Sequence, residues 1–291
     1  MIKIINGDCL RGMETMGEQS VDVVLTSPPY NTNKKAGKSG TLASVKSGKH
    51  YSHIRYDEYV DTKTNEEYVD FTCDLFNGFD RILKKDGCVL YNLNYGANNT
   101  DCLILTLYGI ITKTPFALAD IVSWNKASAI PNNVSHNRLT RMFEPVFVFA
   151  RRSELMTFKA NKKVVSVRPN GQKMYENITN ILHARNNDGP CALNKATYST
   201  ELCRKLLGIY LPSDSCAGVC GWFGVGGGRC VFDPFSGSGT TANACKELGV
   251  DFIGCELSAK QCEFAKKRVE DLMTEVEIVR LEKKEARNED A

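Results

Sequence analysis

With 291 residues, the chain is long enough for one large α/β domain or two smaller ones. Its composition, 42% hydrophobic and 24% charged, is that of a globular protein, and its formal net charge of +3 alone indicates no class of partner. No apolar run approaches the roughly 20 residues that a membrane span needs, and Met1 leads into a strand-like pattern without a cleavable signal. We therefore expect a cytoplasmic protein that contacts no membrane.

Twelve cysteines are scattered along the chain, and without a signal peptide they are expected to be reduced thiols. The spacing of Cys216, Cys220 and Cys230 matches no zinc pattern, and no histidine lies nearby. The sequence therefore predicts no metal site.

The first predicted strand, over residues 2–5, ends just before an acidic residue, Asp8. A carboxylate at the tip of a strand can accept hydrogen bonds from a ribose hydroxyl or an adenine amine. Asp8 is also well placed to cap the short helix expected over residues 10–17, and the two roles are compatible.

The next strand, over residues 21–26, is apolar and mostly β-branched, as in a buried parallel strand. Pro28 and Pro29 have no amide donor and a fixed φ, so Ser27, Pro28, Pro29 and Tyr30 form a rigid corner at the end of the strand. Open α/β sheets bind ligands at this edge. A hydroxyl, fixed carbonyls and an aromatic face together suit a flat heterocycle with an exocyclic amine. The alternative is an ordinary X-Pro-Pro turn, because short motifs recur by chance.

Positive charge is concentrated in two segments. Residues 31–55 hold six Lys or Arg and no acid, and residues 151–185 hold eight Lys or Arg against two acids. Basic segments in loop-like sequence are typical of phosphate contacts, although solvated surface loops are the alternative. The residues predicted to bind DNA are Lys34, Lys35, Lys38, Arg151, Arg152, Lys162, Lys163 and Arg168.

Further along, strands and helices alternate, which is the pattern of a parallel sheet covered on both faces. Helices are expected over residues 65–84, 99–112 and from 200, and strands over 88–93, 119–124 and 141–150. The pattern stops between residues 151 and 190. We interpret residues 151–192 as an inserted target-recognition segment outside the sheet, between a catalytic half (1–150) and a cofactor-binding half (193–291).

A second informative stretch runs from Val231 to Thr241, where a strand leads into a glycine-rich turn and then a helix. Gly237 and Gly239 allow backbone to approach a ligand closely, and a helix N-terminus favours a carboxylate. Asp233 can bind an ammonium group, and Glu256, at the tip of the following strand, can accept two ribose hydroxyls. A purely structural βαβ unit is the alternative.

Together the two stretches resemble the DNA amino-methyltransferases, in particular their permuted β group, in which the catalytic corner precedes the cofactor motif. The resemblance covers most of the chain. It implies a Rossmann-like α/β fold with a mostly parallel sheet, S-adenosylmethionine as cofactor, and double-stranded DNA as substrate. It also suggests a homodimer and a partner restriction endonuclease. The catalytic residues it implies are Ser27, Pro28, Pro29 and Tyr30. The cofactor-binding residues it implies are Asp8, Asp233, Pro234, Phe235, Gly237, Ser238, Gly239, Thr240, Thr241 and Glu256.

Ser27 at the first position of the corner favours cytosine N4 as the target, by resemblance to the cytosine enzymes. Adenine N6 is the alternative, because adenine also presents an amine beside a ring nitrogen. In either case the base has to flip out of the duplex. Tyr30 would stack on it, while Ser27 and the Pro28 carbonyl accept hydrogen bonds from the amine. An RNA or protein methyltransferase and an inactive DNA-binding module are the remaining alternatives.

Overall fold

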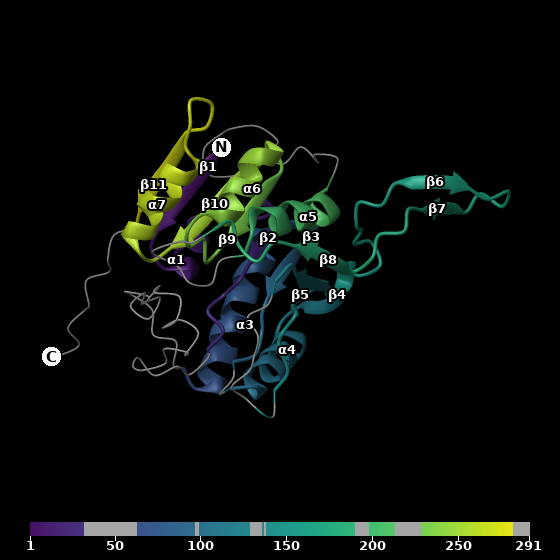
Figure 1. Cartoon of the computed structure of the whole chain (residues 1–291), viewed down its shortest axis with the longest axis horizontal. Helices are drawn as coiled ribbons and strands as arrows, with labels where there is room; N and C mark the ends of the chain where they lie inside the picture. The colour runs from purple at the N-terminus through teal and green to yellow at the C-terminus, as the bar shows by residue number, and fades with distance from the viewer. Residues whose placement is uncertain are drawn as a thin grey trace.

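The computed structural model describes residues 1–31, 63–96, 99–128, 136, 138–189, 198–212 and 228–281. Its centre is a nine-stranded sheet with the order β11-β1-β10-β9-β2-β3-β5-β4-β8 (Figure 1). The strands are β1 (Ile2–Asn6), β2 (Val21–Thr26), β3 (Leu83–Asn92), β4 (Phe116–Lys126), β5 (Phe143–Arg151), β6 (Val164–Val167), β7 (Lys173–Tyr175), β8 (Ile181–Ala184), β9 (Cys230–Asp233), β10 (Asp251–Glu256) and β11 (Val276–Arg280). The helices are α1 (Cys9–Glu14), α3 (Asn65–Ile82), α4 (Asp101–Lys113), α5 (Thr200–Tyr210), α6 (Thr240–Leu248) and α7 (Ala259–Val269), with a short 3-10 turn, η2 (Arg152–Glu154).

The sheet is mostly parallel, as the sequence predicts. Only β5 runs against its neighbours, pairing antiparallel with β3 on one side and β4 on the other. The edge strand β8 pairs parallel with β4, and β1, β10, β9, β2 and β3 form a continuous parallel set. The carboxyl ends of these parallel strands therefore lie along one edge of the sheet, the edge at which the predicted site residues are placed.

Helices cover both faces of the sheet, and each face has its own apolar core. One core packs α5, α6 and α7 on the sheet, and the other packs α1, α3 and α4 on the opposite face (Figure 1). In α3 the buried residues recur every three or four positions, from Tyr68 to Ile82, which is why this helix faces the sheet along its whole length. Thr64 begins α3 with a capping box that includes Glu67.

Boundaries differ from the sequence-based expectation mainly at the start of β3. The helix predicted over residues 65–84 ends at Ile82, and β3 begins directly at Leu83. Asp86 adopts a left-handed conformation with φ of 59° inside this strand, and the pairing register with β2 shifts at the same place. The Lys-Asp-Gly sequence therefore forms an irregularity within the strand, and not a loop before it.

The prediction that residues 151–192 lie outside the sheet is wrong for β8. This strand joins the main sheet beside β4, because Ser123 to Lys126 have an open edge that β8 completes. The rest of the segment does leave the body of the protein: β6 and β7 form a separate two-stranded hairpin that projects away from it (Figure 1). Among the described residues, no helix is long and apolar enough to cross a membrane.

Candidate active site

Polar side chains mark the carboxyl ends of five neighbouring parallel strands. Asp8 follows β1, Glu256 ends β10, Asp233 ends β9, Ser27 follows β2, and Asn92 ends β3. Because the order of these strands in the sheet is β1-β10-β9-β2-β3, the acidic and glycine-rich tips occupy one half of the edge and the Ser-Pro-Pro-Tyr corner the other. The two predicted motifs, about two hundred residues apart in sequence, are thus adjacent.

The corner itself is held from behind by α3. Pro28 is buried, and Ser27, Pro29 and Tyr30 are half-buried. The hydroxyl of Tyr68, a buried residue of α3, donates a hydrogen bond of 2.6 Å to the Pro29 carbonyl. This bond fixes the turn after the strand and occupies the Pro29 carbonyl. It does not involve the Pro28 carbonyl, which is the carbonyl that the sequence analysis predicts to bind the substrate amine.

Ser27 and Tyr30 share a partner in Asn92. The Tyr30 hydroxyl donates to Asn92 Oδ1 at 2.9 Å, Ser27 Oγ donates to the same oxygen at 3.2 Å, and the two hydroxyls are 3.0 Å apart. The Asn92 amide donates in turn to the Pro145 carbonyl at 3.0 Å. That last bond sets the orientation of the side chain, because it requires the nitrogen to face β5 and the oxygen to face the corner.

A carboxylate completes this cluster. Glu144 Oε2 lies 3.4 Å from the Tyr30 hydroxyl, and Glu144 Oε1 accepts a hydrogen bond from the Lys126 ammonium. Lys126 also lies over the ring of Trp124, 4.9 Å from its centroid. Sequence reasoning missed Asn92, Glu144 and Lys126. The available signals were an asparagine near the end of a predicted apolar strand and a glutamate within another.

The residue after the corner is strained and firmly held. Asn31 has a φ of 48°, its side-chain amide donates to the Lys63 carbonyl at 2.9 Å, and its own carbonyl accepts from Asn99 at 3.0 Å. These bonds fix the left-handed conformation, which turns the chain sharply after Tyr30.

Asp233 is buried at the end of β9. Its carboxylate accepts hydrogen bonds from the hydroxyls of Thr26 (2.7 Å), Thr241 (2.7 Å) and Tyr198 (3.2 Å) and from the amide of Phe235 (3.0 Å). Burial raises the pKa of the Asp233 carboxyl, and burial beside Asp233 raises the pKa of Tyr198 well above its ordinary value. The predicted direct contact with a ligand ammonium stays a prediction. Four donors within the protein already surround this carboxylate, so it positions the turn.

Glu256 and Asp8 also bond to backbone. Glu256 accepts from the amide of Gly237 at 2.9 Å and from the amide of Ser258 at 2.9 Å, so it links the glycine turn to the start of α7. Asp8 caps α1 by accepting from the amides of Leu10 and Arg11. The capping role that the sequence allowed for Asp8 is present.

Gly239 has to be glycine for two reasons. Its φ is 76°, and a Cβ atom at this position would lie 2.8 Å from the Cβ of Ala265 on α7. The turn is also held by Arg268 of α7, which donates to the Ser238 carbonyl at 3.2 Å and to the Thr240 hydroxyl at 3.0 Å. The side chains of Thr240 and Thr241 thus bond within the protein.

A search against known families gives a direct match. The model of the N6/N4 methyltransferase family, described as DNA methylase, matches residues 21–267. The chain belongs to this DNA methylase family. Among its relatives, the type II methyltransferase M.HinfI of Haemophilus influenzae is 24% identical, over 96% of this chain and 72% of that protein. M.SmaI of Serratia marcescens is 24% identical, over 92% and 90%. The structure of the PvuII DNA methyltransferase, named as cytosine-N4-specific, superposes with a TM-score of 0.64 and 17% identity, over 94% of this chain and 88% of that one.

The DNA methylase family makes S-adenosylmethionine the methyl donor, and the described residues fit it. Ser236, in the glycine turn, has a buried hydroxyl oxygen without a hydrogen-bond partner among the described residues. Beside it, Pro234 is buried, and the ring of Phe235 is half-buried and lies 6.2 Å from that of Phe71. An apolar rim, an unpaired hydroxyl and an acid at the next strand tip suit a ligand that carries a ring, a ribose and a charged tail.

Two of the arginines predicted to bind DNA serve the methylase fold. Arg151 uses all its donors internally: on Asp80, on Glu154 and on the carbonyls of Leu83 and Lys84. It ties the end of β5 to the junction of α3 and β3, and its contact with DNA stays a prediction. Arg152 donates to the carbonyls of Ile111 and Phe116, and its contact with DNA stays a prediction.

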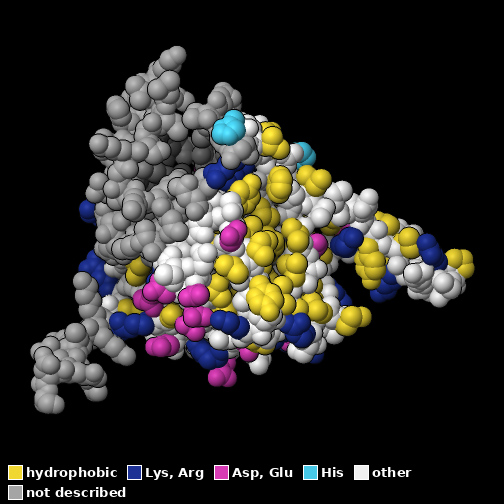
Figure 2. All heavy atoms as spheres, turned by 90° about the horizontal axis from the view of Figure 1, so that it is seen from below, with side chains coloured by type: hydrophobic (Ala, Val, Ile, Leu, Met, Phe, Trp, Pro, Cys, Tyr) yellow, Lys and Arg dark blue, Asp and Glu magenta, His cyan; other side chains and the backbone are white. Residues whose placement is uncertain are grey.

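The other basic residues divide between the hairpin and the part of the chain that is not described. Lys162, Lys163 and Arg168 are exposed on or beside β6, and Lys and Arg side chains follow the projecting hairpin (Figure 2). Lys34, Lys35 and Lys38 lie outside the described residues. No group of three or more His, Cys, Asp or Glu that could hold a metal ion occurs among the described residues.

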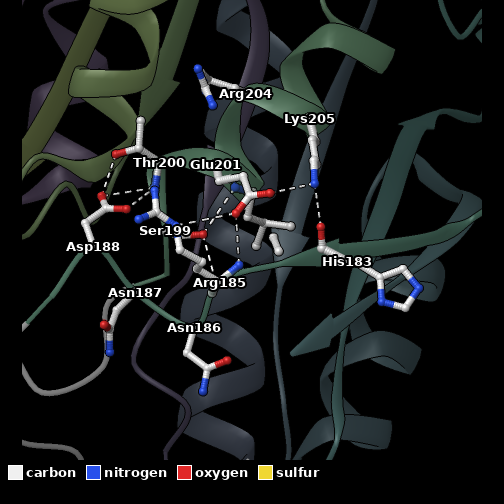
Figure 3. A network of polar contacts seen from close by, with 12 residues as sticks. His183, Arg185, Asn186, Asn187, Asp188, Ser199, Thr200, Glu201, Arg204 and Lys205 are labelled. Carbon is white, nitrogen blue, oxygen red and sulfur yellow. Dashed lines mark hydrogen bonds and ion pairs between the residues drawn. The ribbon is translucent and has the colours of Figure 1, made fainter. Parts of the chain in front are cut away.

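The end of the proposed recognition segment is anchored to the body by polar contacts around the N-terminus of α5. Asp188 accepts from the amide of Thr200, and Glu201 lies between Arg185 and Lys205 (Figure 3). Hydrogen bonding to Lys205 lowers the pKa of Glu201. Asp188 also pairs with Arg268, so the last residues after β8 and the glycine turn are joined through one guanidinium.

Proposed function

We propose that this DNA methylase transfers a methyl group from S-adenosylmethionine to the N4 amine of cytosine in double-stranded DNA, at a specific sequence. The observation that carries the proposal is the orientation of Ser27. Its hydroxyl donates to Asn92 Oδ1, so the lone pairs of Ser27 Oγ are available to accept from an amine. A neutral Ser–Asn pair holds this position, and the resemblance to cytosine enzymes favours the same base.

The residues of the corner would act by alignment. An amine bound by Ser27 Oγ and the Pro28 carbonyl has both of its protons directed toward oxygen, so its lone pair points away from them. When bound, the cofactor supplies an already activated methyl group on a sulfonium. Tyr30 offers its ring for stacking, while its hydroxyl, held by Asn92 at 2.9 Å, prevents rotation of that ring out of the site.

The target base cannot reach the corner within a duplex, so we propose that it flips out. The hairpin β6–β7, with Lys162, Lys163 and Arg168, is the part of segment 151–192 that we propose to contact the DNA backbone. Arrays of such contacts position the protein, and sequence is read by other side chains at the base edges. A homodimer and a partner endonuclease stay predictions.

The experiment is methylation followed by analysis of the nucleosides. Purified protein is incubated with unmethylated DNA and labelled cofactor, the DNA is hydrolysed, and the nucleosides are separated by mass. We expect N4-methylcytosine from the wild type and none from Ser27→Ala, which controls for methylases carried over from the host. Detection of N6-methyladenine would show that the target base is adenine, and the assignment of the methylase site would stand. Label in RNA or protein alone would contradict a DNA substrate.

A further inference from the structure

Amine methylation produces a proton that the corner has to release. When the amine nitrogen bonds to the methyl carbon, the electron pair of the broken carbon–sulfur bond goes to sulfur, and the nitrogen is left with one proton too many. The partners of Ser27 and Tyr30 include Asn92, but a neutral amide does not accept a proton near neutral pH. The chemistry therefore needs a basic group within reach of the two hydroxyls.

Glu144 is the carboxylate that the described residues place there. Its Oε2 atom lies 3.4 Å from the Tyr30 hydroxyl, which lies 3.0 Å from Ser27 Oγ. Ser27, Tyr30 and Glu144 thus form an unbroken chain from the position of the amine to a carboxylate. The other nearby acid, Asp233, is buried and already accepts from four donors.

The position of Glu144 also suits a proton acceptor, because its carboxylate is held by a partner and reaches solvent. The Lys126 ammonium pairs with Oε1, and it is the charged group facing Glu144 among the described residues. The Glu144 side chain is 16% exposed, so water can remove the proton after the reaction. A structural ion pair needs neither the contact with Tyr30 nor this access.

We propose that Glu144 accepts the proton released by amine methylation, through the hydroxyls of Tyr30 and Ser27. The amine proton passes to Ser27 Oγ, the Ser27 proton to the Tyr30 oxygen, and the Tyr30 proton to Glu144 Oε2. Glu144 becomes a neutral carboxylic acid and then gives its proton to water. The two hydroxyls lie within hydrogen-bond distance of each other, and the Tyr30 hydroxyl has acceptors in both Asn92 and Glu144, so the transfer requires rotation of hydroxyl groups and no movement of heavy atoms. The proposal rests on the proposed function, since it acts on the same amine.

The chain supplies a matched control at the other end of the same strand. Glu154, just beyond β5, pairs with Arg151 and is 17% exposed, close to the exposure of Glu144. It lies far along the strand from the corner and touches neither Ser27 nor Tyr30 among the described contacts. Glu144→Gln and Glu154→Gln therefore remove comparable carboxylates, one in the proposed chain and one outside it.

The test measures single-turnover methyl transfer to DNA, together with the affinities for DNA and cofactor. General acid–base catalysis contributes roughly a hundredfold or more, so we expect Glu144→Gln to slow transfer about tenfold to a hundredfold with both affinities unchanged. Glu154→Gln should transfer at the wild-type rate. The wild-type rate should fall as the pH is lowered, and the fall should be weaker in Glu144→Gln, which has no carboxylate to protonate.

Chemical rescue separates proton acceptance from positioning. In Glu144→Ala, added formate should restore transfer, and formamide, of the same shape without charge, should not. Equal rescue by both, or wild-type transfer by Glu144→Gln, would overturn the proposal. If Glu144→Ala does not fold, the rate and pH profile of Glu144→Gln decide alone. Absence of any methyl in DNA from the wild type would instead contradict the proposed function.

Discussion

Thr26 and Asp233 are joined by a buried hydrogen bond of 2.7 Å, although 207 positions separate them in the sequence. Thr26 ends the strand that carries the Ser-Pro-Pro-Tyr corner, and Asp233 ends the strand that carries the glycine turn. The bond therefore fixes the distance between the two motifs. A methyl transfer enzyme depends on such a fixed distance, because small displacements of the reacting groups are costly in rate.

Replacing Asp233 should destabilise the whole protein before it affects ligand binding. Asp233→Ala leaves the donors of Thr26, Thr241, Tyr198 and Phe235 without their acceptor, and each buried unsatisfied group costs about 1–3 kcal/mol. We expect a loss of about 3 kcal/mol or more in the free energy of unfolding, measured by urea denaturation. Thr26→Val, which removes one of these bonds, should cost about 1 kcal/mol. Equal stability of Asp233→Ala and wild type would contradict the network.

The pH dependence of stability gives a second test of the same residue. Burial raises the pKa of Asp233 above its unfolded value. Folding therefore favours the protonated form: its contribution to stability is full below the unfolded pKa and is lost as the pH rises through the folded pKa. Relative to Asp233→Asn, which does not titrate, the wild type should gain stability as the pH falls. Urea denaturation of both proteins across the acidic range would reveal the opposite trend if the carboxyl were stabilised in its charged form.

Glu256 should matter for the cofactor more than for the fold. It links the amides of Gly237 and Ser258, and it is placed at the strand tip where ribose hydroxyls are expected. Loss of a charge-assisted hydrogen bond costs about 1.5–3 kcal/mol, so Glu256→Ala should weaken S-adenosylmethionine binding roughly tenfold to a hundredfold. Calorimetry is the measurement. Glu247→Ala, which removes a carboxylate of the exposed pair with Arg204, should bind the cofactor as the wild type does.

The basic hairpin should determine how steeply DNA affinity falls with salt. Each neutralised phosphate contact contributes a slope of about 0.9 in log affinity against log salt concentration. Changing Lys162, Lys163 and Arg168 to Gln should lower that slope by up to about three units. Lys113→Gln, on the exposed pair with Asp70, should leave it unchanged. A triple variant with the wild-type slope would place the phosphate contacts elsewhere, with Lys34, Lys35 and Lys38 as the next residues to change.

The sequence predicts the strands and the two motifs well because both depend on local patterns. Apolar β-branched runs mark β2 and β9, and the residues that follow them have local effects on the backbone: Pro28 fixes φ, and Gly239 permits a left-handed turn. Parallel strands then bring these motifs to one edge without further information.

What the sequence does not show is long-range and depends on burial. Glu144 reaches Tyr30 across 114 positions only because β5 inserts antiparallel between β3 and β4, and nothing local to Glu144 indicates that order. Charge counts likewise show neither burial nor pairing: Arg151 adds to a basic segment in sequence, but its side chain is 14% exposed and pairs with Asp80. For Asp233 the strand tip is predicted correctly, yet the hydroxyls that surround it come from three different parts of the chain.

Asn92 provides the sharpest test of how the corner works. Its oxygen accepts from Ser27 and Tyr30, and its nitrogen donates to Pro145. Asn92→Leu keeps the approximate shape but removes the acceptor, so the Ser27 proton has to point elsewhere, including toward the amine it should accept from. We expect single-turnover methyl transfer to fall at least tenfold with unchanged cofactor affinity. Asn92→Asp keeps the acceptor, loses the bond to Pro145 and adds a negative charge, and it should retain more activity than Asn92→Leu. Asn161→Leu, which removes an amide bonded to the carbonyls of Gly208 and Leu211 away from the site, should lower stability without slowing transfer.

If Asn92→Leu transferred methyl as fast as the wild type, the orientation of Ser27 would not depend on Asn92, and the alignment of the amine would have to come from the Pro28 carbonyl alone.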